Sequence, residues 1–404
     1  MLGVERLLAE DGGRSVLAGR RVGLIANPTS VDRALTPTAD LLRAEEARGG
    51  YRLTALFAPE HGLHAAAEAT SLQEHGVDPR TGLPVWSLYS ETTEPTRRML
   101  ADVDVLVFDL QDVGVRYYTF IWTMYRAMAA AAREGRAFVV LDRPNPLGDR
   151  VDGPTLLPAL QSFVGLAPLP MQHGLTVGEL ASYLAAELLG GQLDLTVVPM
   201  TGYDPGPPSG SAGLLWVPPS PNLPHRSSVW AHAATGLIDG TTASQGVGTS
   251  LPFEWVGDPS IDAAAARRLA SELDAAELEG VAFRPMLARP SLGKAAGELC
   301  GGVQLHIVDA DVFRPARVAV HLLAAMRGMS QTQWLARTDL HRDGEVGDFL
   351  WVDRLSGDDE LRRMLDDGVH PDVIVEGWGA AAAQFSRAAE PHRLYGGVRD
   401  GARE

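Results

Sequence analysis

The sequence reads Val103-Asp-Val-Leu-Val-Phe108 and continues without a break into Asp109-Leu-Gln-Asp-Val-Gly114. The first part has the apolar, β-branched composition of a strand buried on both faces, whereas the second part is rich in polar groups. Other apolar stretches that run directly into polar clusters lie at 21–26, 53–58, 84–88 and 137–141. In an open α/β sheet, ligands bind outside the carboxyl ends of the strands. These clusters are therefore expected to line one cleft.

Helical segments are expected between these strands, at 35–47, 94–101 and 119–133. Alternation of strand and helix predicts a parallel sheet that is covered on both faces. Thr176 and Glu179 have the spacing of a capping box and predict the start of a further helix. A sixth strand is expected at 193–200, and the Gly- and Pro-rich segment 202–213 is expected to be a loop at the lip of the cleft.

The composition changes near residue 258. An Ala-rich helix is expected at 261–275, followed by strands at 281–285 and 302–308. Further helices are expected at 315–326, 359–367 and 380–389. We therefore predict an α/β fold with a Rossmann-like, mostly parallel sheet and a smaller C-terminal α+β domain. The catalytic domain is predicted at 1–257, and the smaller domain, which lines the cleft, at 258–404.

The composition limits the classes of partner. The 404 residues are 45% hydrophobic and carry a formal net charge of -16, which argues against nucleic acid or an anionic membrane as a partner. The sequence has no apolar run long enough to span a bilayer, and its start lacks the features of a signal peptide. A cytoplasmic location is expected, or export if the sequence was shortened from a longer one. The single Cys300 excludes an internal disulfide.

Neither a metal nor a nucleotide cofactor is predicted. His61, His64 and His75 do not form a recognisable zinc-binding pattern with other ligands. The sequence also lacks the Gly-x-Ser-x-Gly nucleophile elbow, the phosphate-binding P-loop and the dinucleotide fingerprint.

The turn Pro59-Glu-His-Gly62 contains the first candidate catalytic residue. Glu60 directly follows a predicted strand, and a partly shielded carboxyl group there could have a raised pKa and serve as a general acid. The alternative is a turn carboxylate that only accepts hydrogen bonds from backbone amides.

Two other clusters combine carboxylates with arginine. Asp109, Gln111 and Asp112 precede Arg116, and such a set could position a sugar or a water molecule, or Arg116 could be a structural ion-pair partner. The segment 142–146 is stiffened by two prolines, which suits a preorganised site and equally suits a plain turn at the end of a strand.

The motifs taken together resemble a known family. They include Leu56-Phe-Ala-Pro-Glu-His-Gly62, Val107-Phe-Asp-Leu-Gln-Asp-Val-Gly114, Val140-Leu-Asp-Arg-Pro-Asn-Pro146 and His173-Gly-Leu-Thr-Val-Gly-Glu-Leu-Ala181. In order and spacing, over nearly the whole chain, the sequence is similar to the bacterial exo-β-N-acetylmuramidases. These glycoside hydrolases remove terminal N-acetylmuramic acid from peptidoglycan fragments.

The resemblance implies an exo-acting glycosidase that takes a saccharide substrate and needs no cofactor, with Glu60 as its catalytic acid. The second catalytic group is expected to be Asp109 or Asp112, unless the acetamido group of the substrate takes that role. The resemblance also implies a set of substrate-binding residues: Asn27, His61, Gln111, Arg116, Tyr117, Asp142, Arg143, His173, Asn222 and Gln245.

One loop departs from the family pattern. Where the family typically has Asn, Glu and Arg, this chain has Thr242, Gln245 and Val247. Loss of the two charged side chains, Glu and Arg, could retune the specificity or weaken the activity. Two alternatives therefore stay open: a non-catalytic protein that binds cell-wall sugars, and a hydrolase for another amino sugar.

Overall fold

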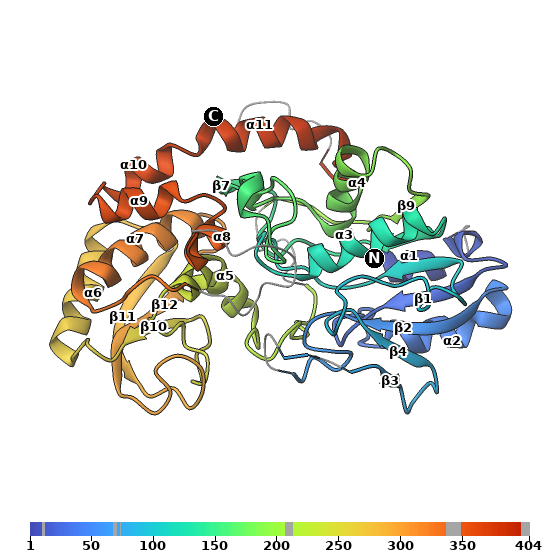
Figure 1. Ribbon diagram of the computed structural model, residues 1–404, viewed down its shortest axis with the longest axis horizontal. Coiled ribbons are helices and arrows are strands. Elements are labelled where there is room, and N and C mark those ends of the chain that lie inside the picture. The colour runs from blue at the N-terminus through green and yellow to red at the C-terminus, as the bar shows by residue number, and fades with distance from the viewer. Residues whose placement is uncertain (10–12, 68–70, 73, 207–212, 337–348, 397–404) are drawn as a thin grey trace.

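The structure, a computed structural model, describes residues 1–9, 13–67, 71–72, 74–206, 213–336 and 349–396. Figure 1 shows two lobes, one around a large sheet and one around a small sheet. This is the α/β fold that the sequence predicts, with a mostly parallel sheet and a smaller C-terminal part.

The large sheet has seven strands in the order β3-β4-β2-β1-β5-β6-β9. Their bounds are Arg21–Ile25 (β1), Arg52–Ala58 (β2), Gly76–Val77 (β3), Pro84–Ser87 (β4), Val105–Phe108 (β5), Ala137–Leu141 (β6) and Leu195–Val198 (β9). All neighbouring pairs are parallel except β3 with β4. The five strands predicted from the apolar stretches therefore end at one edge, and the strand order reverses between β1 and β5.

Side chains of the central strands alternate between two cores, as the period-two geometry of a strand requires. Leu106 and Phe108 of β5 belong to the core that includes side chains of α3 (Phe120–Arg133) and α4 (Val177–Leu188). Val105 and Val107 belong to the core on the other face, which includes side chains of α1 (Gly3–Leu8) and α2 (Thr38–Gly49). Each such side chain contributes about 1.5–3 kcal/mol by leaving water.

The second lobe is built on the antiparallel sheet β10-β12-β11. Its strands are Trp255–Asp258 (β10), Val281–Ala288 (β11) and Cys300–Ile307 (β12), and α6 (Ala263–Ala275) packs against β11 and β12. The other helices that follow the large sheet are α5 (Arg226–Thr235), α7 (Pro315–Met329), α8 (Trp351–Ser356), α9 (Glu360–Asp366), α10 (Pro371–Glu376) and α11 (Gly379–Ala389). A two-stranded sheet, β7 (Asp152–Thr155) and β8 (Pro170–Gln172), and the short helices η1 (Gly13–Val16), η2 (Pro158–Leu160), η4 (Gly236–Gly240) and η5 (Glu390–His392) complete the elements.

Several predicted elements need comment. The prediction of a helix at 94–101 is wrong, because the structure has turns there. The hydroxyls of Thr92 and Thr96 form hydrogen bonds with backbone groups in these turns. Such local side-chain bonds compete with helix formation. The predicted loop at 202–213 lies partly outside the described residues, and its described part has neither helix nor strand. The predicted boundary at 257/258 falls within β10, which pairs in the small sheet, so the division into 1–257 and 258–404 stays a prediction.

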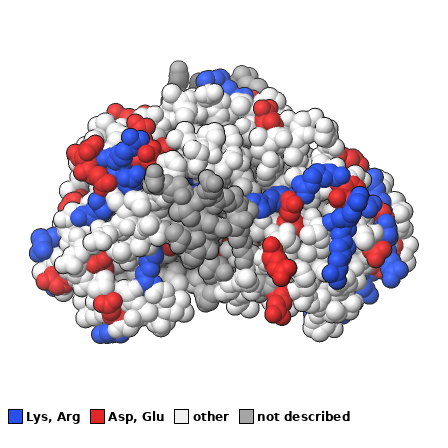
Figure 2. All heavy atoms as spheres, in the orientation of Figure 1, with Lys and Arg blue, Asp and Glu red and all other residues white. Residues whose placement is uncertain are grey.

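Within the described residues, no helix has the length and apolar character needed to cross a membrane. Figure 2 shows acidic and basic side chains interspersed on the face in view.

The chain ends by returning to the large sheet. In Figure 1, α11 runs from the second lobe across to α4. Beyond it, the Arg393 guanidinium donates to the Gly174 carbonyl at 3.1 Å, and the Tyr395 hydroxyl donates to Asp142 Oδ2 at 2.5 Å. The same Tyr395 oxygen accepts the Met200 N–H at 2.7 Å. This segment therefore fastens the second lobe to the loop that follows β6.

Asp142 is fully buried, and its burial raises its pKa to about 6, although hydrogen bonds from Tyr395, Gly178 and Thr176 act in the opposite direction. Because the folded-state pKa lies above the usual 3.8, the folded state favours the protonated carboxyl. The contribution of this group to stability is therefore fully present below about pH 4, and it is lost as the pH rises through about 6.

We expect Tyr395→Phe to reduce the free energy of unfolding more at pH 8 than at pH 5. Above pH 6 the lost bond is charge-assisted and worth about 1.5–3 kcal/mol, whereas below pH 5 it joins neutral groups and is worth about 0.5–1.5 kcal/mol. Urea unfolding at both pH values measures the difference. Tyr51→Phe is the matched control, because its hydroxyl donates to the Leu42 carbonyl, which does not titrate. Equal losses at both pH values for Tyr395→Phe would contradict the prediction.

Candidate active site at the carboxyl ends of the strands

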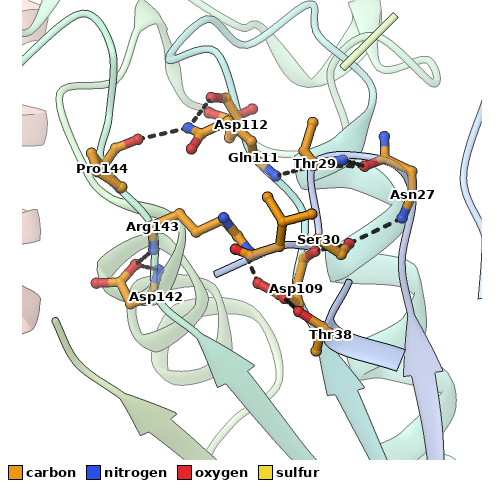
Figure 3. Close-up of polar contacts among 12 residues, drawn as sticks. Asn27, Thr29, Ser30, Thr38, Asp109, Gln111, Asp112, Asp142, Arg143 and Pro144 are labelled. Atoms are coloured by element: carbon orange, nitrogen blue, oxygen red, sulfur yellow. Dashed lines mark hydrogen bonds and ion pairs between the residues drawn. The ribbon is translucent and has the colours of Figure 1, made fainter. Parts of the chain in front are cut away.

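The loop after β1 is ordered by Asn27. Its side-chain oxygen accepts from the Thr29 N–H at 2.9 Å and from the Thr29 hydroxyl at 2.6 Å (Figure 3). Its amide nitrogen donates to the Pro219 carbonyl at 3.3 Å. Asn27 therefore connects the end of β1 to a segment 192 residues away in sequence.

A buried ion pair joins the ends of β5 and β6. Asp109 Oδ1 lies 2.6 Å from Arg143 Nε, and Asp109 Oδ2 accepts the Thr38 hydroxyl at 2.5 Å (Figure 3). Asp109 is fully buried and Arg143 is 5% exposed. Arg143 Nη2 also donates to the Val31 carbonyl at 2.8 Å. Both oxygens of Asp109 are thus engaged with protein groups, and the pair ties together loops from three strands.

Gln111 also connects the loops that follow β5 and β6. Its amide nitrogen donates to the carbonyls of Asp112, at 2.8 Å, and Pro144, at 2.7 Å (Figure 3). Gln111, Arg143 and Trp216 are among the residues that line a pocket beside these loops, whereas Glu60 and Asp112 are not. This pocket therefore lies beside the loops after β1, β5 and β6 and is not lined by the two carboxylates described next.

Asp112 is held by two donors on one oxygen. Oδ2 accepts the Gly114 N–H at 2.8 Å and lies 3.2 Å from His173 Nε2. His173 Nδ1 accepts the Leu175 N–H at 3.2 Å, which assigns the ring proton to Nε2. Oδ1 is buried and has no hydrogen-bond partner among the described residues. One oxygen of Asp112 is therefore fixed, and the other keeps its capacity to accept.

Glu60 lies where β2 ends. The residue is only 6% exposed, and its Oε2 accepts a hydrogen bond from the Thr119 hydroxyl at 2.7 Å. The next residue, His61, adopts the left-handed conformation with φ 70°, and its Nδ1 lies 2.8 Å from the Ala67 carbonyl. This sharp turn directs the chain away from the strand and leaves Glu60 at the sheet edge.

The phenol of Tyr118 is influenced by the charges of both carboxylates, Glu60 and Asp112. Burial raises the pKa of its phenol well above the usual 10, and the charges of Glu60 and Asp112 raise it further. The Ser220 hydroxyl lies beside the phenol and favours the opposite shift, yet within the described parts of the chain Tyr118 Oη has no partner at hydrogen-bond geometry. The phenol therefore stays protonated and lies close to both acidic groups.

His232 of α5 packs behind this tyrosine. Its ring meets those of Tyr117, Tyr118 and Phe253 edge-on, at centroid distances of 5.3, 6.0 and 4.5 Å. Burial lowers the pKa of His232 to about 4, so the ring is neutral at physiological pH. Tyr118 is therefore backed by an aromatic cluster that carries no charge.

Some predicted site residues are directed elsewhere. Arg116 is fully buried, and its guanidinium donates to the carbonyls of Pro154, Leu169 and Leu355. Burial lowers its pKa to about 10. The Tyr117 hydroxyl donates to two carbonyls of α5. Both side chains therefore hold backbone segments together.

The two remaining predicted residues lie on the segment after β9 and on the loop that differs from the family pattern at Thr242, Gln245 and Val247. Asn222 is partly buried, two residues after Ser220. Gln245 is 9% exposed, and its amide nitrogen donates to Asp239 Oδ1 at 3.0 Å. Lys294 Nζ lies 3.1 Å from the same oxygen, and the Trp351 indole donates to Asp239 Oδ2 at 2.7 Å. Gln245 thus belongs to a network centred on Asp239.

The sequence analysis did not select Tyr118, Ser220 or His232 as site residues. Tyr118 follows Tyr117 and Ser220 stands two residues before Asn222, both of them predicted site residues, which was a usable signal, whereas nothing in the sequence around His232 distinguishes it. In the described part of the chain, no group of three or more His, Cys, Asp or Glu side chains is arranged to hold a metal ion.

Comparison with known proteins adds the family. Residues 22–227 match the family model described as exo-beta-N-acetylmuramidase NamZ, N-terminal, and residues 230–395 match its C-terminal counterpart. The chain is 38% identical over 395 residues to the peptidoglycan beta-N-acetylmuramidase NamZ of Bacillus subtilis, covering 97% of this chain and 91% of that protein.

Two solved structures of DUF1343 family proteins from Bacteroides fragilis are also similar. The first has a TM-score of 0.83 and 34% identity, with 98% of each chain covered. The second has a TM-score of 0.75 and 28% identity, covering 98% of this chain and 99% of the other. Since the family models and these relatives span the sheet, the carboxylates and the second lobe alike, the chain belongs to the exo-β-N-acetylmuramidase NamZ family of glycosidases.

Proposed function

We propose that this protein removes terminal β-linked N-acetylmuramic acid from peptidoglycan fragments, with Glu60 as the general acid. The observation that carries the proposal is the position of the Glu60 carboxyl at the end of β2, nearly buried and bonded to Thr119. The relative from Bacillus subtilis, named a peptidoglycan beta-N-acetylmuramidase, supports the choice of substrate.

Glycoside hydrolysis needs an acid that protonates the leaving oxygen. Glu60 suits this role because the Thr119 hydroxyl fixes one of its oxygens and the residue is almost entirely buried. A fixed, shielded acid avoids reorganisation during the reaction.

The choice between Asp109 and Asp112 as the second acidic group favours Asp112. Both oxygens of Asp109 are engaged, by Arg143 and Thr38, so its carboxylate is fully used in holding loops. Asp112 has an oxygen that accepts from no described group, and its charge reaches the same phenol as that of Glu60.

N-acetylmuramic acid carries a lactyl carboxylate, and a protein that selects this sugar is expected to offer it a cation. The family's loop arginine is replaced by Val247, whose side chain lies on the side of Gly293 where a Cβ would stand. Lys294 follows directly, but it is paired with Asp239. We therefore propose that this chain discriminates muramic from glucosamine substrates more weakly than its relatives do.

We expect Glu60→Gln to lower kcat on an unactivated disaccharide by about 10²- to 10⁴-fold, because the amide cannot donate the required proton. Thermal unfolding should show an intact fold. Glu134→Gln, which removes the half-buried partner of the exposed Arg97, is the matched control and should retain full activity. If Glu60→Gln turns over the disaccharide normally, Glu60 is not the acid. If the unmodified protein binds but never hydrolyses muramic acid glycosides, it is a sugar-binding protein instead.

We expect Val247→Arg to raise the ratio of kcat/KM for muramic over glucosamine glycosides by about 10- to 100-fold, the worth of one charge-assisted hydrogen bond. Val247→Leu, which keeps the apolar contact without charge, is the control.

Adding Gln245→Glu to Val247→Arg should be tolerated. Gln245→Glu alone should lower stability, because it places a second carboxylate beside Asp239. A strong muramic preference in the unmodified protein that none of these changes alters would show that the loop does not contact the lactyl group.

A further inference from the structure

Two polar atoms of the candidate site are buried and unused. Asp112 Oδ1 and Tyr118 Oη each have no hydrogen-bond partner among the residues that the structure describes, although both residues are more than nine-tenths buried. A buried polar group without a partner costs about 1–3 kcal/mol. Such a cost persists where the group serves a ligand or a reaction.

The two atoms differ in what they offer. Asp112 Oδ1 is left as an acceptor, because the His173 Nε2–H and the Gly114 N–H already donate to Oδ2. The Tyr118 phenol can donate, because its pKa lies far above neutral pH. The site therefore presents one acceptor and one donor, and the charges of Glu60 and Asp112 both act on the donor phenol.

An acetamido group is the complement of this arrangement. Its N–H donates and its carbonyl oxygen accepts, and the sugar of the proposed substrate carries such a group next to the anomeric carbon. Resting on the proposed function, we propose that Asp112 Oδ1 accepts the N–H and Tyr118 Oη donates to the carbonyl of the substrate's 2-acetamido group, and that this acetamido oxygen is the nucleophile of the reaction.

The chemistry balances without a further reactant except water. In the first step the acetamido oxygen forms a bond to the anomeric carbon, the glycosidic bond breaks, and Glu60 gives its proton to the leaving oxygen. Asp112 stabilises the positive charge that develops on the amide nitrogen. In the second step water attacks the anomeric carbon, the ring bond to the acetamido oxygen breaks, and Glu60 takes a proton from the water. Two displacements retain the β configuration.

His173 and Gly114 are positioning groups in this scheme. They fix Asp112 Oδ2, so the carboxylate can present only Oδ1 to the substrate. In Asp112→Asn the side-chain oxygen must take the place between these two donors. The new NH₂ group then occupies the place of Oδ1 and repels the substrate N–H. The variant therefore loses the interaction even though its shape is unchanged.

The first test needs only the unmodified protein. Aryl glycosides of N-acetylmuramic acid are prepared with zero, one, two or three fluorines on the acetyl group, and the anomer formed first is identified by NMR. We expect the β product and a kcat/KM that falls steadily with each fluorine, because fluorine weakens the nucleophilic oxygen. An α product, or a rate that does not respond to fluorine, would overturn the inference while leaving the proposed function intact.

The second test uses variants. A muramic acid thiazoline, which mimics the cyclised intermediate, should bind the unmodified protein at least about 10²-fold more tightly than free N-acetylmuramic acid does. Asp112→Asn should abolish this advantage and lower kcat by on the order of 10²- to 10³-fold, with a smaller loss for Tyr118→Phe. Asp152→Asn, a buried aspartate that pairs with Arg314, is the matched control and should keep both the thiazoline affinity and the fluorine response. Equal affinity of Asp112→Asn and the unmodified protein for the thiazoline would contradict the assignment.

Discussion

The buried pair of Asp109 and Arg143 is the contact on which the rest of the site depends. It joins the ends of β5 and β6, and through Thr38 and Val31 it reaches the start of α2 and the loop after β1. Removing one partner of a buried ion pair costs about 3–5 kcal/mol, because the other charge stays behind without compensation. The loops at the carboxyl edge therefore form one rigid unit, which is what a preorganised site requires.

Within that unit the acidic residues divide into two kinds. Asp109 and Asp142 accept hydrogen bonds from protein donors on both oxygens. These bonds hold the loops and the returning C-terminal segment in place. Asp112 is bonded through one oxygen only. Because the supporting carboxylates fix the surrounding backbone, the structure tolerates the desolvation cost of this one oxygen.

Much of the fold could be predicted from the sequence, because a strand buried on both faces is a short apolar run and its polar end marks the sheet edge. The direction of individual side chains could not be predicted. Arg116 and Tyr118 stand two residues apart in one motif, yet Arg116 donates to a carbonyl 239 residues away, whereas Tyr118 lies beside the carboxylates. His232 was missed for a related reason: its place behind Tyr118 is set by the packing of α5, which no local pattern records. The site was thus predictable as an edge of the sheet, but not as a set of contacts.

The loop that differs from the family pattern at Gln245 and Val247 keeps its polar side chains hydrogen-bonded. Relative to the family pattern, Gln245 removes a negative charge and Val247 removes a positive one, so the two changes leave the net charge of the loop unaltered. A glutamate at 245 would put its carboxylate beside that of Asp239, whereas the glutamine amide donates to it. Lys294 and Trp351 also bind Asp239. The loop therefore keeps a satisfied network in its changed form, so its charge changes can alter substrate preference without first costing the protein its fold.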